Sequence, residues 1–173
     1  MRTNSISPSD VIRHFDLRPL PVEGGFYRVS YTGNLQLPAS VLPPSISSER
    51  PAKSVIYYLL TADTKSRLHR LEIDEMWHFY LGDQVDLFVF GPDDDYTKVE
   101  LGHAVLEGKT VQAVVPARSW FGARLRSGGS WALMACSLAP AFSDEDFSLP
   151  GDADFTSLLA RYPEQREILY ELR

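Results

Sequence analysis

The chain has little cysteine, no excess of basic charge and no long apolar run, and each shortage excludes a class of protein. Cysteine occurs once in 173 residues, at Cys136, so the chain can form neither an intrachain disulfide nor a zinc site with two or more thiolates. Lys and Arg number 17 against 23 Asp and Glu, which gives a net charge of −6. Contacts with nucleic-acid phosphates need clustered basic side chains, so we expect no nucleic-acid partner. The apolar runs are far shorter than a membrane span of about 20 residues, and the N-terminus lacks the apolar stretch of a signal peptide. We therefore expect a cytoplasmic protein with no membrane partner.

The chain is instead rich in short strand-like segments that are separated by turn signals. Its composition is 44% hydrophobic and 23% charged, which is typical of globular proteins, and its length suits a single domain over residues 1–173. The segments with strand character are 55–60, 68–73, 76–81, 85–90, 98–101, 111–115, 122–125 and 131–138. Short strands at this spacing, with no helical pattern between them, predict a mainly β sandwich or barrel rather than a βαβ fold.

Helical signals flank this β region. Ser7-Pro8-Ser9-Asp10 is typical of a helix start, and the helix is expected to end before Pro19. A Gly24-Gly25 bend then leads into the first aromatic strand, so the barrel core is predicted over about 22–142. Residues 36–50 are rich in Pro and Ser and are expected to form an exposed loop. Two short helices, broken by Pro163, are expected within about 152–172 and should cover part of the outside of the barrel.

The polar residues with chemical potential gather between residues 69 and 82. His69, Glu75 and His78 lie within ten positions of one another, on either side of an expected strand junction. Imidazole and carboxylate together suit a divalent transition metal or general acid–base catalysis.

The arrangement His69-x-Leu71-x-x-x-Glu75, followed by Gly82, resembles the first conserved motif of the cupins. In metal-binding cupins this motif supplies two histidines and a glutamate, and a second motif supplies another histidine. Here Leu71 stands at the position of the second histidine. The corresponding second motif begins at Pro116, with Arg118 in place of its glycine and Phe121 in place of its histidine.

The chain resembles one cupin branch, DUF985 (Cupin_5), over nearly its whole length. The segments that carry this resemblance are 21–28, 54–60, 66–70, 75–82, 112–116 and 136–142, followed by Asp146-Phe147. A departure is Ala141, where the branch usually has glycine. The resemblance implies an RmlC-like jelly roll, that is, a double-stranded β-helix barrel with short N- and C-terminal helices. It also implies a homodimer, and no settled activity.

A metal site would need His69, Glu75 and His78 as ligands. Only His69 and Glu75 remain of the usual four-ligand set, and sites for Zn²⁺ and similar ions usually keep three or more protein ligands. Strand side chains alternate between faces, so if Glu75 points into the barrel, His78 points out unless a bulge intervenes. We therefore expect no cofactor, with a divalent metal as the alternative.

Without a metal, His69 and Glu75 remain as a polar pair inside an apolar barrel, where the carboxylate can orient the imidazole as a base. We predict that the protein binds a small polar organic molecule there. Aromatic walls with a few polar groups are typical of ligand sites. The remaining lining residues are expected to be Tyr58, Trp77, Gln112 and Trp120.

Two enzymatic alternatives stay open. The first is a metal-independent sugar-nucleotide epimerase or isomerase, by analogy with other cupins, in which His69 is the base and Tyr58 or Tyr80 the acid. Its diphosphate would require basic side chains, for which the candidates are Arg67, Arg70 and Arg118. The second is a metal-dependent cupin enzyme. The Glu23-Gly24-Gly25 bend either sets Glu23 near the barrel mouth or is only a turn.

Overall fold

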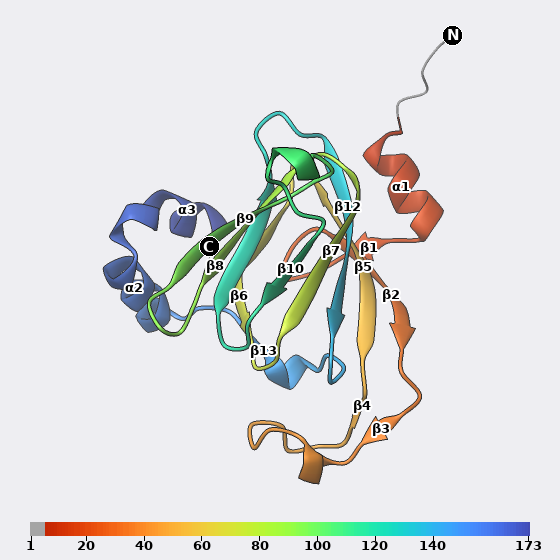
Figure 1. The fold of residues 1–173 in the computed structure, drawn as a ribbon, viewed down its shortest axis with the longest axis vertical. Coiled ribbons are helices and arrows are strands. Elements are labelled where there is room, and N and C mark those ends of the chain that lie inside the picture. Colours follow the sequence, from red (N-terminus) through yellow and green to blue (C-terminus); the bar gives the residue numbers. More distant parts are fainter. Residues whose placement is uncertain (1–5) are drawn as a thin grey trace.

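The computed structural model describes residues 6–173 and contains two antiparallel sheets that face each other across a barrel interior (Figure 1). The six-stranded sheet contains, in spatial order, β1 (Arg18–Pro19), β2 (Phe26–Thr32), β5 (Ser54–Thr61), β12 (Trp131–Leu138), β7 (Glu75–Gly82) and β10 (Gln112–Val115). The five-stranded sheet contains β13 (Phe147–Ser148), β6 (Lys65–Leu71), β11 (Trp120–Leu125), β8 (Val85–Phe90) and β9 (Tyr96–Leu101). The predicted mainly β barrel with short terminal helices is confirmed.

All the strand segments expected between residues 55 and 138 are present, with ends displaced by three residues at most. The sequence pattern missed β1, β13 and the pair formed by β3 (Gln36–Leu37) with β4 (Arg50–Pro51). Each of these strands has only two residues, which is too short for alternation of apolar and polar side chains to be visible. The Pro- and Ser-rich segment between β3 and β4 is a long loop, as expected, and it contains a short 3₁₀ turn (Ala39–Val41).

One end of the barrel interior is packed solid. Inward-facing side chains of both sheets, among them Phe79, Leu87, Leu125 and Met134, are almost fully buried and form one continuous cluster. They alternate along each strand with outward-facing residues, which is the pattern of a sheet with one face on a core. The other end, around the start of β7, is not filled.

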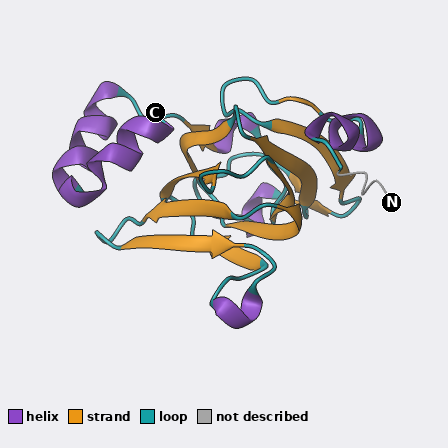
Figure 2. Ribbon diagram, turned by 90° about the horizontal axis from the view of Figure 1, so that it is seen from above, coloured by secondary structure: helices purple, strands orange, loops and turns teal. Residues whose placement is uncertain are grey.

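The helices lie outside the barrel, on opposite sides (Figure 2). Helix α1 (Pro8–Phe15) is capped by Ser7, whose hydroxyl accepts from the Asp10 N–H, and it buries Val11 against outward-facing leucines of the six-stranded sheet. Helices α2 (Asp152–Arg161) and α3 (Arg166–Leu172) pack on the outer face of the five-stranded sheet, against Phe88, Phe90 and Trp120. No helix within residues 6–173 combines the length and the apolar character that crossing a bilayer requires.

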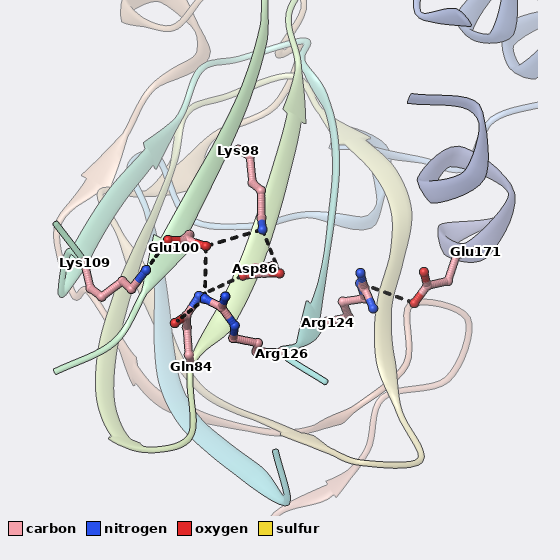
Figure 3. A network of polar contacts seen from close by, with 8 residues as sticks. All are labelled: Gln84, Asp86, Lys98, Glu100, Lys109, Arg124, Arg126 and Glu171. Carbon is pink, nitrogen blue, oxygen red and sulfur yellow. Dashed lines mark hydrogen bonds and ion pairs between the residues drawn. The ribbon is translucent and has the colours of Figure 1, made fainter. Parts of the chain in front are cut away.

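Charged side chains lie on the outer face of the five-stranded sheet, beside the part that α2 and α3 cover (Figure 3). Asp86 of β8 forms an ion pair with Lys98 of β9 at 3.0 Å. Glu100 forms ion pairs with Lys98 at 3.4 Å and with Arg126 at 3.2 Å, and it also pairs with Lys109. This network holds neighbouring strands together on the solvent side. It lies on the opposite face of β8 from the barrel interior, since Val85, Leu87 and Val89 point inward.

Candidate functional site

The unfilled end of the barrel contains a cavity of about 220 Å³ between the two sheets. Its walls are mostly apolar and include Tyr27, Ile56, Leu71, Leu138, Phe142 and Phe147. The polar side chains that line it are Glu23, Thr32, Ser54, His69 and Glu75. An apolar cavity with a few polar groups is typical of a ligand site.

His69 comes from β6 and is almost completely buried, with 2% of its surface exposed. Its Nδ1 lies 2.6 Å from the backbone oxygen of Arg67. A carbonyl oxygen can only accept, so Nδ1 carries the proton, and in the neutral imidazole Nε2 is an acceptor. Phe121 and Phe147 hold the ring, with centroids at 4.0 and 5.3 Å. Within residues 6–173, Nε2 has no hydrogen-bond partner.

A β-bulge in β6 determines what this strand presents to the cavity. Phe121 of β11 pairs with His69, but Ala123 pairs with Ser66, so three residue steps on β6 match two on β11. Ser66 and His69 would point to opposite faces of a regular strand, and the extra residue brings both to the interior. The backbone of the bulged residue Arg67 is then free for other bonds. Its N–H donates to the Glu23 carbonyl at 2.8 Å, and its carbonyl accepts from His69.

Glu75 is the first residue of β7, in the opposite sheet, and 7% of its surface is exposed. The Trp77 indole N–H donates to Glu75 Oε2 at 2.6 Å. Burial, and to a smaller extent the charge of Glu23, raises the pKa of Glu75 from 4.5 to about 8, although the Trp77 bond opposes this shift. Glu75 is therefore mostly protonated at neutral pH. Its Oε1 has no partner among the residues that the structure describes.

Glu23 is held at the cavity by the tight turn that precedes β2. Ser66 Oγ donates to Glu23 Oε1 at 3.1 Å. Gly24 has φ +103°, and a Cβ there would overlap the carbonyl oxygen of Lys65, so the turn lies against β6 only because this residue is glycine. Val22 has φ +71°, which is rare for a β-branched residue. Arg67 Nη1 donates to its carbonyl at 3.1 Å.

Of the two interpretations of the Glu23-Gly24-Gly25 bend, the structure therefore supports the one that sets Glu23 near the barrel mouth. The hydrogen bonds from Ser66 and Arg67 fix it there.

A buried ion pair braces the cavity mouth. Arg50 Nη1 lies 2.7 Å from Asp146 Oδ2, and both side chains are at least nine-tenths buried. Arg50 also donates to the carbonyl oxygen of Ala141, at 3.5 Å. Three residues of the cavity lining belong to this arrangement. Pro51 follows Arg50, Phe147 follows Asp146, and Ala141 provides the carbonyl oxygen. The pair thus ties β4 to the segments that precede β13.

The family profile described as Cupin superfamily (DUF985) matches residues 9–150, which is most of the chain. The chain belongs to this family. No functionally curated protein matches this cupin significantly.

Solved structures support the same assignment. Protein SO0799 from Shewanella oneidensis is 32% identical, with a TM-score of 0.80 over 97% of this chain and 98% of that chain. A hypothetical protein from Leishmania major is 26% identical, with a TM-score of 0.82 over 96% and 98%. Oxalate decarboxylase from Bacillus subtilis is 13% identical, with a TM-score of 0.53 over 91% of this chain and 38% of that chain. At that identity the likeness concerns the fold alone.

Some predicted site residues of this cupin lie at the cavity or behind its wall, and others lie elsewhere. His69 and Glu75 line the cavity, and Trp77 supports Glu75 from the core. Tyr58 is fully buried beside Trp77, and its hydroxyl donates to the Gly24 carbonyl at 3.0 Å. Burial and the charge of Glu23 raise the pKa of Tyr58 well above its usual value. Trp77 and Tyr58 therefore shape the wall and the turn behind the cavity.

Gln112 and Trp120 were expected in the lining, and the structure places both elsewhere. Gln112 is exposed on the outer face of β10, where its amide donates to His78 Nδ1 at 3.0 Å. Trp120 points outward from β11 into the cluster beneath α2 and α3, where Arg70 stacks on its ring. Both faces of β11 are covered, so burial of Trp120 does not imply an inward position.

The expected metal ligands do not form one set in this cupin barrel. His78 points away from Glu75, as strand alternation predicts, and its Nε2 donates to Ser137 Oγ at 2.9 Å. Among residues 6–173, no three His, Cys, Asp or Glu side chains are grouped so as to hold a metal ion. The donor set of His69, Glu75 and His78 therefore does not fit a metal, and no chemical step is derived through one.

The arginines expected to bind a diphosphate also lie away from the cavity. Arg67 bonds the Val22 and Arg173 carbonyls, Arg70 stacks on Trp120, and Arg118 pairs with Glu72 at 3.1 Å on the surface. None of the described residues that line the cavity is Lys or Arg.

The single thiol, Cys136, lies on the inner face of β12 and is buried in the barrel core. Burial, together with the charges of Glu75 and Glu23, raises the pKa of Cys136 well above its usual value. It is therefore a protonated, inert thiol that acts as a small buried hydrophobe.

Proposed function

We propose that this cupin binds a small organic molecule in the open end of its barrel, with His69 and Glu75 as the polar groups that orient it. The observation that carries the proposal is the pair of unpartnered polar atoms, His69 Nε2 and Glu75 Oε1, at the same apolar cavity. The fully buried side-chain atoms without a partner in the described chain are Arg70 Nε, Ser119 Oγ and Arg124 Nε, so His69 Nε2 and Glu75 Oε1 instead reach the surface of the cavity and are free to bond a ligand there.

The size of the cavity supports a ligand of about one ring. A dry apolar cavity of about 150 Å³ holds benzene, whereas drug-sized ligands occupy about 300–1,000 Å³. The cavity volume of about 220 Å³ lies between these values. A sugar nucleotide is much larger, and the lining supplies no basic group for a diphosphate, so the epimerase alternative receives no support from this site.

Native mass spectrometry tests the binding function. Wild-type protein and the variants His69→Gln and His78→Gln are incubated with a metabolite extract below about 300 Da, then desalted and measured intact. We expect an adduct with the wild type and with His78→Gln, and none with His69→Gln, because His78 lies on the outer face. If the wild type carries no adduct, or if His69→Gln retains it, the proposal fails.

A second candidate function is proton transfer on a neutral substrate. His69 Nε2 is available as a base, while burial keeps Glu75 protonated as an acid at the same cavity. Glu75 suits the acid role better than Tyr58, whose hydroxyl is bonded to Gly24, or Tyr80, which is exposed on the outer face. The test is deuterium incorporation from solvent next to the carbonyl group of small ketones. Incorporation should require both His69 and Glu75, and its absence would leave only the binding function.

A further inference from the structure

The linings of the cavity and its entrance contain acidic side chains but neither Lys nor Arg among the described residues. Glu23 and Glu75 line the cavity, and an outer hollow of about 250 Å³ shares Glu23, Tyr27, Phe142 and Phe147 with it. Asp144 stands at this entrance. The field along this path therefore favours entry of a cation and opposes an anion.

The unpartnered polar atoms of the cavity can all accept hydrogen bonds once Glu75 is ionised, and a neighbouring cation promotes that ionisation by lowering the pKa of Glu75. His69 Nε2 is an acceptor because Nδ1 holds the ring proton against the Arg67 carbonyl. Glu75 uses Oε2 for Trp77, and Glu23 uses Oε1 for Ser66. Glu75 Oε1 has no partner within the described chain, and the Glu23 carboxyl group also interacts with the Tyr58 hydroxyl. An ammonium group has three N–H donors and no acceptor, so it matches three such acceptors.

We propose that the ligand is a small primary amine whose ammonium group binds among His69, Glu75 and Glu23, an inference that rests on the binding function proposed above. Charge-assisted hydrogen bonds to carboxylates are about twice as strong as neutral ones. Burial and the charge of Glu23 raise the pKa of Glu75, and a bound ammonium group lowers it again because it supplies an opposite charge, so that Glu75 binds the cation as a carboxylate.

The walls suit the organic part of such a molecule. Tyr27, Phe142 and Phe147 line both the cavity and its entrance, and aromatic faces attract organic cations. Ile56, Leu71 and Leu138 provide an apolar surface deeper in the cavity. A hydrated metal ion would gain nothing from these walls, whereas an amine with one ring or a short branched chain fills about 220 Å³ and covers them.

Three probes of matched shape test this inference by isothermal titration calorimetry in a buffer with chelator. Benzylamine is a cation at pH 7, benzyl alcohol is neutral and benzoate is an anion. We expect benzylamine to bind at least about tenfold more tightly than benzyl alcohol, and benzoate to bind most weakly. Glu75→Gln and Glu23→Gln should each weaken benzylamine binding by about tenfold or more and leave benzyl alcohol within about twofold. Glu107→Gln, at the exposed end of the 3₁₀ turn Val105–Glu107, is the matched control and should change neither.

The outcomes separate this inference from the binding function. If benzyl alcohol or benzoate binds as tightly as benzylamine, the amine assignment is overturned and the cavity remains a binding site. If none of the three binds, the assigned size and charge are both wrong, and the native mass spectrometry decides the binding function. Displacement of benzylamine by stoichiometric Mn²⁺ or Zn²⁺ in chelator-free buffer would also overturn it, since the occupant would then be a metal.

Discussion

The unusual state of Glu75 predicts a loss of folding stability as pH rises through neutrality. The unfolded chain loses the Glu75 proton near pH 4.5, whereas the folded chain keeps it until about pH 8. Between these two pH values unfolding releases a proton, so the contribution of Glu75 to the free energy of unfolding falls as pH increases. Below pH 4.5 and above pH 8 this contribution does not change with pH. Each pH unit inside the window costs about 1.4 kcal/mol, which amounts to about 3.5 kcal/mol between pH 5 and pH 8.

Substitution of Glu75 by Gln isolates this effect, because the amide has nearly the same shape as the protonated carboxyl group and does not titrate. Urea unfolding of both proteins at pH 5, 6, 7 and 8 should give free energies that diverge, with Glu75→Gln more stable at pH 8 by about 3.5 kcal/mol relative to the difference at pH 5. Other titrating groups are common to both proteins and cancel in the difference. Parallel pH profiles would show that Glu75 ionises normally and would refute the reasoning.

Three further predictions concern the fold around the cavity. Arg50→Ala should destabilise the protein by about 3–5 kcal/mol in urea unfolding, because it leaves the buried Asp146 carboxylate unpaired, whereas Asp146→Asn should cost less than that but more than about 1 kcal/mol, because Arg50 keeps its ion pair with the exposed Glu145. Gly24→Ala should cost clearly more stability in thermal unfolding than Gly108→Ala, because both glycines have positive φ but a Cβ meets the backbone only at Gly24. Burial lowers the pKa of His78 below 6.5, so stability falls as pH drops from 6.5 toward the folded pKa, and His78→Gln should be less sensitive to pH in that range.

Each of these predictions has an outcome that contradicts it. Losses below about 1 kcal/mol for Arg50→Ala and Asp146→Asn would indicate a solvated surface pair. Equal losses for the two glycine variants would mean that left-handed backbone alone, without close approach to β6, accounts for the effect. If the stability of His78→Gln falls below pH 6.5 as steeply as that of the wild type, another titrating group causes the fall.

The sequence predicted the strands well because each long strand alternates inward and outward side chains between clear turns. It also predicted from the same alternation that Glu75 and His78 point to opposite faces, and the structure agrees. Alternation does not say which face of a strand is inside when both faces carry apolar residues. Gln112 was misplaced for this reason, since Val114 shares its outer face.

Trp120 and Ser66 show two other limits. Trp120 is buried by helices far along the chain, and short-range patterns contain no information about that contact. The bulge that turns Ser66 inward contains neither glycine nor proline, so β6 itself gives no sign of it. The available signal was in the partner strand, where Gly122 lies mid-strand against the bulge, with its site for a Cβ 2.8 Å from the Ser66 carbonyl oxygen.

Because Cys136 is buried, the rate at which a thiol reagent labels it can report ligand binding. Thiol-labelling reagents can reach this sulfur only when the barrel wall opens, so the labelling rate counts opening events. A molecule that occupies the cavity binds the closed form and slows labelling in proportion to its occupancy. Unlabelled, colourless compounds can therefore be ranked by the time that one cysteine takes to react, without a substrate assay and without any added probe on the protein.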